Sequence, residues 1–356
     1  MKSKVYFVGV RNSDSPQTIQ EKLKLLLSRS RLLDFIGKGQ EVAIKIHFGE
    51  EENTGYVKPF YAHVVVDEVI KRKARCFLAD TNTLYRGKRT NSSDHLKLAF
   101  LHGFTKKICG ANVIIPDDTK KENVAGKIIN QRFIKTAKVA RLFKEAEVLV
   151  GIAHFKGHIM TGFGGALKNI GMGCASREGK LKQHSGISPL VYVKKCIGCG
   201  ECIKACPAGA IFMKDNLAYI DPAKCIGCAT CIAVCPQSAI DVNWEAGGSN
   251  MQQKMVEYAY AVLKDKKAQS AFINFAIKIT KECDCLAKDD PRIVDDVGIF
   301  ASGDPVSIDK ASRDLVNKKA GKDIFKEAHP ERNGFIQLEY AENLGLGNLE
   351  YELVEV

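Results

Sequence analysis

The sequence predicts an α/β fold with a largely parallel sheet, interrupted by a small cysteine-rich domain. Segments with strand patterns alternate with segments of helical periodicity before and after the interruption, an order typical of parallel sheets. Residues 196–236 carry one cysteine motif twice. We therefore expect residues 1–189 and 244–356 to form two parts of one α/β scaffold, with residues 190–243 inserted as a separate domain.

Local patterns predict each element of the scaffold. Ser15 and Pro16 mark a helix start, and Ile19, Leu23 and Leu26 follow at helical spacing. Short apolar runs predict buried strands. Helices are expected over 16–33, 59–73, 94–101, 139–145, 251–263 and 305–319, and strands over 5–10, 41–46, 75–79, 111–115, 147–152, 271–279 and 297–301.

Both copies of the cysteine motif read C-x2-C-x2-C-x3-C-P, the pattern of bacterial two-cluster ferredoxins. Three closely spaced thiolates can occupy three corners of a cubane, and in such ferredoxins the fourth cysteine of each run binds the other cluster. Zinc is the alternative for paired C-x-x-C motifs, but the doubled run with a proline after each copy favours iron and sulfur. We expect two 4Fe-4S clusters, one held by Cys196, Cys199, Cys202 and Cys235, the other by Cys225, Cys228, Cys231 and Cys206.

These clusters make the inserted domain a two-cluster bacterial-type ferredoxin unit of α+β class, and they indicate electron transfer without fixing its direction. The 13 cysteines of the chain fit metal ligation in a reducing compartment better than disulfides. No apolar run approaches the roughly 20 residues of a membrane span, and the first residues enter a strand pattern rather than a signal sequence. We expect a cytoplasmic protein that does not enter a membrane.

The net charge of +12 belongs to the scaffold, because residues 190–243 contain five lysines and four acidic residues. The basic residues are scattered and accompany no nucleic-acid motif, which argues against a nucleic-acid partner. An anionic small-molecule substrate and a redox partner protein are the partners that this charge favours.

Polar and sulfur-containing residues follow five of the predicted strands. Ligands bind beyond the carboxyl ends of strands in open α/β sheets, so we expect these residues to share one pocket. The residues in question are His47, Gly49 and Glu50, then Asp80, Thr81 and Asn82, then His154, Lys156 and His158, then Cys283 and Cys285, and finally Ser302 and Asp304.

A third metal site is one interpretation of the remaining cysteines. Two thiols one residue apart, Cys283 and Cys285, could join Cys174 and one histidine (His154, His158 or His184) around an additional metal ion. The alternative is that they are buried free thiols, the role that we expect for Cys76 and Cys109. The glycine-rich segment 162–173 could line an anion with backbone N–H groups or form a packed turn.

Four segments outside the cysteine motif carry a resemblance to a known family. They read KIHFGEEENTGYVKP (45–59), DTNTLYRGKRTN (80–91), KGHIMTGFGGALKNIGMGCASREGK (156–180) and, after the ECDC stretch, VGIFASGDPVSID (297–309). Together with the motif, they resemble the iron-sulfur members of the domain-of-unknown-function 362 family. The resemblance implies a scaffold with an inserted two-cluster ferredoxin, and it implies that these segments form one site. It implies no particular reaction.

The leading hypothesis is a redox enzyme whose two clusters exchange electrons with a small anionic substrate at the strand ends. His47, His154 or His158 would handle protons near pH 7, and Lys168 would orient the anionic substrate. Substrate would be bound by Asp80, Asn82, Arg86, Arg89, Asn169 and Lys180, although a charge run such as 86–89 is often only a solvated surface. A non-catalytic electron carrier with a docking scaffold and a metal-handling or cluster-assembly protein are the alternatives, so enzymatic activity stays open.

Overall fold

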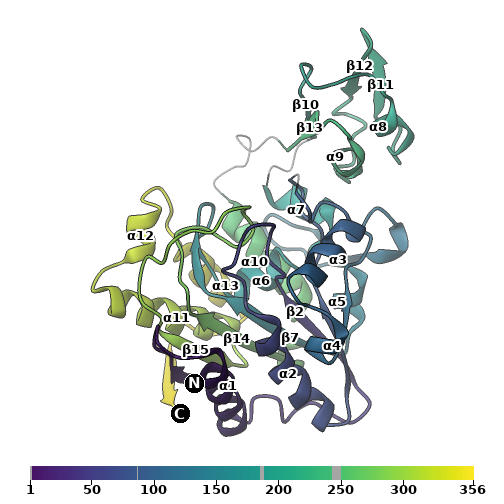
Figure 1. The fold of residues 1–356 in the computed structure, drawn as a ribbon. Coiled ribbons are helices and arrows are strands. Elements are labelled where there is room, and N and C mark those ends of the chain that lie inside the picture. Colours follow the sequence, from purple (N-terminus) through teal and green to yellow (C-terminus); the bar gives the residue numbers. More distant parts are fainter. Residues whose placement is uncertain (1, 86, 185–187, 243–249) are drawn as a thin grey trace.

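An eight-stranded mixed sheet forms the centre of the scaffold (Figure 1). The structure, a computed structural model, describes residues 2–85, 87–184, 188–242 and 250–356. In spatial order the strands are β16 (Tyr351–Glu355), β1 (Ser3–Gly9), β15 (Gly298–Ser302), β14 (Ser270–Ala276), β7 (Val148–His154), β2 (Glu41–Ile46), β3 (Arg75–Ala79) and β4 (Asn112–Ile114).

All strands of this sheet run in one direction except β15, which is antiparallel to both β1 and β14. The predicted largely parallel sheet is therefore confirmed. The reversal of β15 makes one prediction wrong, namely that Ser302 and Asp304 share a pocket with the other strand ends. Ser302 pairs with Phe272, near the start of β14. Ser302 and Asp304 thus lie at the opposite edge from the other strand ends, where Asp304 accepts hydrogen bonds from the first N–H groups of α11 (Pro305–Ala320).

Side chains of the central strands alternate between two helical layers. Val42, Ile44 and Ile46 of β2 face one apolar cluster, whereas Ala43 faces the other, as the period of two in a strand requires. Residues of the first layer come from α1 (Pro16–Ser30), α2 (Pro59–Lys71), α3 (Ser92–Leu101) and α4 (Lys106–Cys109). Those of the second come from α5 (Arg141–Glu145), α6 (Ala166–Gly171), α10 (Met251–Leu263), α11, α12 (Ile324–Ala328) and α13 (Ile336–Asn343).

Two hairpins were not predicted. Strand β5 (Val124–Ile128) pairs with β6 (Thr136–Ala140), so the helix expected over 139–145 begins only at Arg141 as α5. Strands β8 (Lys156–His158) and β9 (Gly162–Gly164) form the second hairpin, just after β7. By contrast, β2, β3 and α10 have the bounds predicted from the sequence.

The cysteine module, residues 190–242, is small and stands beside α7 (Arg177–His184) in Figure 1. Its elements are β10 (Leu190–Val191), α8 (Glu201–Lys204), β11 (Ile211–Lys214), β12 (Leu217–Ile220), α9 (Thr230–Val234) and β13 (Ile240–Asp241). Strand β10 pairs antiparallel with β13, so the chain enters and leaves the module at one place. Leu84 and Leu181 of the scaffold pack in the same apolar cluster as the module residues.

The domain boundaries stay predictions, because residues 185–187 and 243–249, which lie next to both boundaries, are outside the described residues. Within the described part of the chain, no helix is long and apolar enough to cross a membrane.

Candidate functional site

A cavity of about 510 Å³ lies at the carboxyl ends of the parallel strands. Strands β2 and β7 and the segments that follow β3 and β14 contribute to its wall. Of the site residues predicted from the sequence, it brings together His47, Asp80, Arg89, His154, His158, Lys168, Asn169, Lys180, Cys283 and Cys285. Asn82 and Cys174 do not line it, and Arg86 lies outside the described residues.

The cavity wall is cationic. Among the described residues, the ionisable lining includes Lys45, Lys156, Lys168, Lys180 and Arg89, against a single carboxylate, Asp80. Two of these groups form a buried ion pair, with Lys45 Nζ 3.0 Å from Asp80 Oδ1. Burial raises the pKa of Asp80, but the charge of Lys45 and other nearby cations outweighs it and holds the pKa below its usual range.

Lys45 is held in place by its neighbours. Its ammonium donates to Asn169 Oδ1 at 2.9 Å, and the amide nitrogen of Asn169 donates to the backbone oxygens of Lys45 and Ile152. Gly173 makes room for this side chain, since a Cβ there would lie 2.5 Å from Lys45 Nζ. Asn169 therefore bridges β2 and β7. Its side-chain oxygen and nitrogen both make these contacts within the protein, and its role in substrate binding stays a prediction.

Lys180 extends from α7 into the same wall. Its ammonium donates to Thr81 Oγ1 at 2.6 Å and to the backbone oxygen of Asn82. Burial lowers its pKa to about 7, although Asp80 and Asp118 act in the opposite direction. A lysine with this pKa gains and loses its proton near pH 7. The side chain of Asn82 instead donates to Ser92 Oγ, Pro116 O and Asp118 Oδ1, away from the cavity lining.

His47 follows β2 and contacts Arg89, with 2.7 Å between His47 Nε2 and Arg89 Nη1. The backbone N–H of Gly49 donates to the other ring nitrogen. Burial, then the charge of Arg89, lowers the pKa of His47 to about 3. The ring stays neutral near pH 7, so His47 does not titrate there as the sequence hypothesis expected. Arg89 itself is anchored by Glu50 and the hydroxyl of Tyr85.

His154, at the end of β7, has an acceptor at each ring nitrogen. Nδ1 lies 2.7 Å from Asp284 Oδ1, and Nε2 lies 2.9 Å from the backbone oxygen of Ile277. Both contacts belong to the segment that follows β14. We conclude that His154 fixes the position of this segment, and in particular of Asp284 between Cys283 and Cys285.

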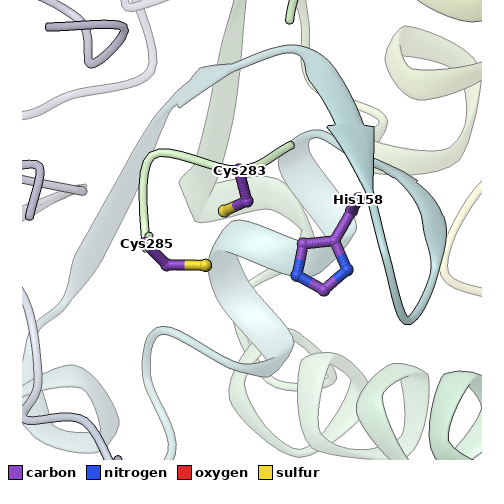
Figure 2. Close-up of side chains that lie close together, drawn as sticks. All are labelled: His158, Cys283 and Cys285. Atoms are coloured by element: carbon purple, nitrogen blue, oxygen red, sulfur yellow. The ribbon is translucent and has the colours of Figure 1, made fainter. Parts of the chain in front are cut away.

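His158, Cys283 and Cys285 gather at one point of the cavity (Figure 2). Their ligand atoms lie within 4.8 Å of one another, so the group could hold a metal ion. The hairpin that carries His158 is joined to the segment before Cys283, because the N–H of Gly157 donates to Thr280 O at 2.9 Å. Gly157 permits this approach, since a Cβ there would lie 2.2 Å from Lys281 O.

Cys174 does not join this group. It lies in the apolar core, where burial raises the pKa of its thiol to about 12. Lys45, Asp80 and Lys180 also influence this pKa, and Cys174 is not part of the group of His158, Cys283 and Cys285. The three-cysteine site expected from the sequence is therefore reduced to two cysteines and His158 among the described residues.

The glycine-rich segment 162–173 contains β9 and α6. The first N–H groups of α6, those of Ala166 and Leu167, donate to the carboxylate of Asp309 at 2.7 and 2.9 Å. Asp309 is buried, and burial raises its pKa to about 6. The helix start that could have bound an external anion is thus occupied by a carboxylate of the protein, and the packed-turn interpretation holds.

The eight motif cysteines line two further small cavities, four at each. Cys196, Cys199, Cys202 and Cys235 surround one, and Cys206, Cys225, Cys228 and Cys231 surround the other. Backbone N–H groups approach several of the sulfurs: that of Ala210 lies 3.3 Å from Cys206 Sγ and that of Ala239 lies 3.2 Å from Cys235 Sγ. Each copy of the motif therefore contributes its fourth cysteine to the other copy's cavity.

A family model described as "Domain of unknown function (DUF362)" matches residues 42–314. The chain belongs to the DUF362 family. A comparison of this DUF362 chain with curated proteins gave no match.

Two solved structures are similar to the DUF362 chain. One is the lactate racemase apoprotein from Thermoanaerobacterium thermosaccharolyticum, with 14% identity and a TM-score of 0.40, covering 76% of this chain and 50% of that one. The other is a protein from Thermotoga maritima, with 14% identity and a TM-score of 0.43, covering 88% of this chain and 61% of that one. This chain thus spans half to about three fifths of the length of these two proteins.

Sequence reasoning missed Lys45 and Tyr85 in the cavity wall of the DUF362 chain. Lys45 had a signal, because it is a lysine within the otherwise apolar end of a buried strand, and a buried lysine requires a partner. Tyr85 had no comparable signal. Its hydroxyl donates to the backbone oxygen of Cys285, 200 residues away, which only the fold reveals.

Proposed function

We propose that this chain is an iron-sulfur electron-transfer protein, and that its two 4Fe-4S clusters exchange electrons with a small anionic molecule in the strand-end cavity. The observation that carries the proposal is the crossed grouping of the eight cysteines around two cavities, in which the fourth cysteine of each motif copy lies with the first three of the other copy. This grouping is the ligand arrangement of two-cluster ferredoxins. When bound, such clusters supply single electrons.

The donor set fits iron-sulfur clusters better than zinc. A tetrahedral zinc site with Zn–S bonds of about 2.3 Å brings its sulfur atoms within roughly 4 Å of one another. Among the described residues, the only group of three or more candidate ligand atoms within 4.8 Å is that of His158, Cys283 and Cys285. Four thiolates around each cavity, contributed by both copies of the doubled motif, suit a cubane. N–H groups beside Cys206 and Cys235 would adjust the reduction potential.

Contact between module and scaffold supports electron exchange with the cavity. Leu84 lines the cavity and also belongs to the apolar cluster of the cysteine module. Leu181 belongs to the same cluster, follows Lys180 in sequence, and lies 3.8 Å from the Cβ position of Gly227 in the second motif. The motif copy that supplies Cys225, Cys228 and Cys231 therefore approaches Leu181 of the scaffold, next to the cavity residue Lys180.

The charge of the cavity supports an anionic ligand, and the module surface supports a redox partner protein. Five cationic side chains against one carboxylate favour small carboxylates or phosphates. On the module, Ile197 and Ile226 are 64% and 59% exposed, each beside a motif cysteine. Exposed apolar side chains next to a cluster suit docking of an electron-transfer partner, and this would also serve a non-catalytic carrier.

Elemental analysis after anaerobic purification tests the proposal first. Two cubanes require about eight iron and eight acid-labile sulfide per chain. Zinc without sulfide would contradict it. Electron exchange with an anion in the cavity is tested by following the visible absorbance of the reduced clusters while small carboxylates and phosphates are added. We expect Lys168→Met to slow any anion-dependent reoxidation and to leave iron content unchanged, and exposed Lys24→Met to behave as wild type.

A metal-handling protein is the second candidate, favoured by the group of His158, Cys283 and Cys285. It predicts metal beyond the two clusters that is lost on Cys283→Ala and Cys285→Ala substitution. Equal metal content in wild type and variant would exclude it.

A further inference from the structure

Cys283 and Cys285 stand out among the cysteines outside the motif because both line the cavity. They are separated by Asp284, and their sulfur atoms lie within 4.8 Å of each other. Cys283 is 3% exposed. Figure 2 shows both sulfurs directed to the same space as the His158 ring. Two thiols this close can either bind one metal ion or join each other.

The segment that carries the two thiols is anchored on both sides. Asp284 accepts from the His154 ring at 2.7 Å, and its backbone oxygen accepts from the N–H of Glu50 at 3.0 Å. The backbone oxygen of Cys285 accepts from the hydroxyl of Tyr85 at 2.9 Å. The thiols therefore face the cavity because of contacts that do not involve the sulfur atoms.

The two thiols have different electrostatic surroundings. Lys168 Nζ lies 3.7 Å from Cys283 Sγ. This contact with an ammonium group favours a thiolate at Cys283. One thiolate beside one thiol is the arrangement of a nucleophilic cysteine and its disulfide partner.

The hydrogen bonds of His158 disfavour its binding to a metal ion. Its Nδ1 accepts from the backbone N–H groups of Met160 and Thr161, at 3.1 and 3.2 Å. In a neutral ring the proton then resides on Nε2. Metal-binding histidines normally donate from their second nitrogen. His158 instead presents an N–H donor to the Cys283 sulfur, which suits a thiolate.

We propose that Cys283 and Cys285 form a dithiol–disulfide couple that exchanges electrons with the two clusters. This inference rests on the proposed function. In reduction, each cluster gives up one electron, the S–S bond breaks, Cys283 becomes a thiolate, and Cys285 takes up one proton. Oxidation reverses each step: the S–S bond forms, two electrons return to the clusters, and the proton leaves Cys285. Two one-electron carriers thus match one two-electron couple.

A reductive titration of the whole protein tests the couple. Wild type is first equilibrated anaerobically with oxidised glutathione, and then reduced in steps. We expect uptake of about four electrons per chain, two by the clusters and two by the disulfide. Cys283→Ala with Cys285→Ala should take up about two electrons with unchanged iron and sulfide. Cys76→Ser, which replaces a cysteine away from the cavity, should match wild type.

Trapping with N-ethylmaleimide and peptide mass analysis supply the second measurement. The fraction of peptide that carries a Cys283–Cys285 disulfide should fall as the glutathione redox buffer becomes more reducing. For a two-electron couple, the ratio of disulfide to dithiol peptide should change tenfold for about every 30 mV in buffer potential. Uptake of two electrons by both proteins, or one additional metal ion that only wild type binds, would overturn the couple. Loss of iron and sulfide from wild type would instead refute the proposed function, so the two failures are distinguishable.

Discussion

Pairs of cysteine substitutions separate the crossed ligand arrangement from the uncrossed one. Cys235 is four residues from Cys231 in sequence, yet it lines the cavity of Cys196, Cys199 and Cys202. Substituting two ligands of one cluster should remove one cluster, whereas substituting one ligand of each should remove both. Alanine is preferred to serine, because a serine oxygen can replace a thiolate as ligand.

The expected magnitudes follow from the ligand sets. Wild type should contain about eight iron. The variant with Cys196→Ala and Cys235→Ala should retain about four, because both residues line the same cavity. The variant with Cys225→Ala and Cys235→Ala should retain close to none. The apolar residues shared by the two halves, including Ile211, Ile220 and Ile240, remain in both variants and keep the module packed.

Iron and sulfide analysis, with spin quantification of the reduced proteins, measures the outcome. Far-UV circular dichroism is the control, since the scaffold has apolar cores of its own and should stay folded. If the first variant lost both clusters and the second kept four iron, the ligands would be uncrossed and the grouping that carries the proposed function would be wrong.

Three further substitutions test the scaffold and the cavity. Because burial lowers the pKa of Lys180 to about 7, the affinity for sulfate, whose own charge is constant near neutrality, should fall as the pH rises through 7 when measured by calorimetry. Lys180→Met should bind sulfate weakly and without this dependence. Asp309→Ala should lower the free energy of unfolding in urea by about 2 kcal/mol or more, because two buried N–H groups of α6 lose their acceptor. Gly173→Ala should cost about 1–3 kcal/mol in the same assay, because its Cβ would meet Lys45 and Asn169; stability equal to wild type would show that Lys45 is free to move.

The strand-end rule located most of the cavity from sequence because it depends only on strand order and direction. His47, Asp80, His154 and Cys283 follow parallel strands and line one cavity. The rule failed at Ser302 because β15 is antiparallel. Every residue of β15 and of β14 is buried, so their apolar patterns look alike and carry no information on direction.

Side-chain orientation was less predictable than residue position. Asn82 lies at a predicted strand end, but its amide is directed to Ser92 and Asp118. Cys174 shares the glycine-rich segment with cavity residues, but it lies in the core. In both cases the sequence indicates the right neighbourhood, and contacts with residues distant in sequence decide which way the side chain points.

The charge of the cavity and its proposed redox chemistry are coupled. Buried cations are costly unless they are paired, and Lys45 and Arg89 have carboxylate partners in Asp80 and Glu50. Lys168 instead contacts the sulfur of Cys283. Reduction of the proposed couple places a thiolate beside Lys168 and lessens its attraction for an anion, whereas the disulfide leaves that attraction intact. By linkage, an anion bound near Lys168 must disfavour reduction of the couple to the same extent. The oxidised protein should therefore bind phosphate more tightly than the reduced protein, and Lys168→Met should abolish the difference.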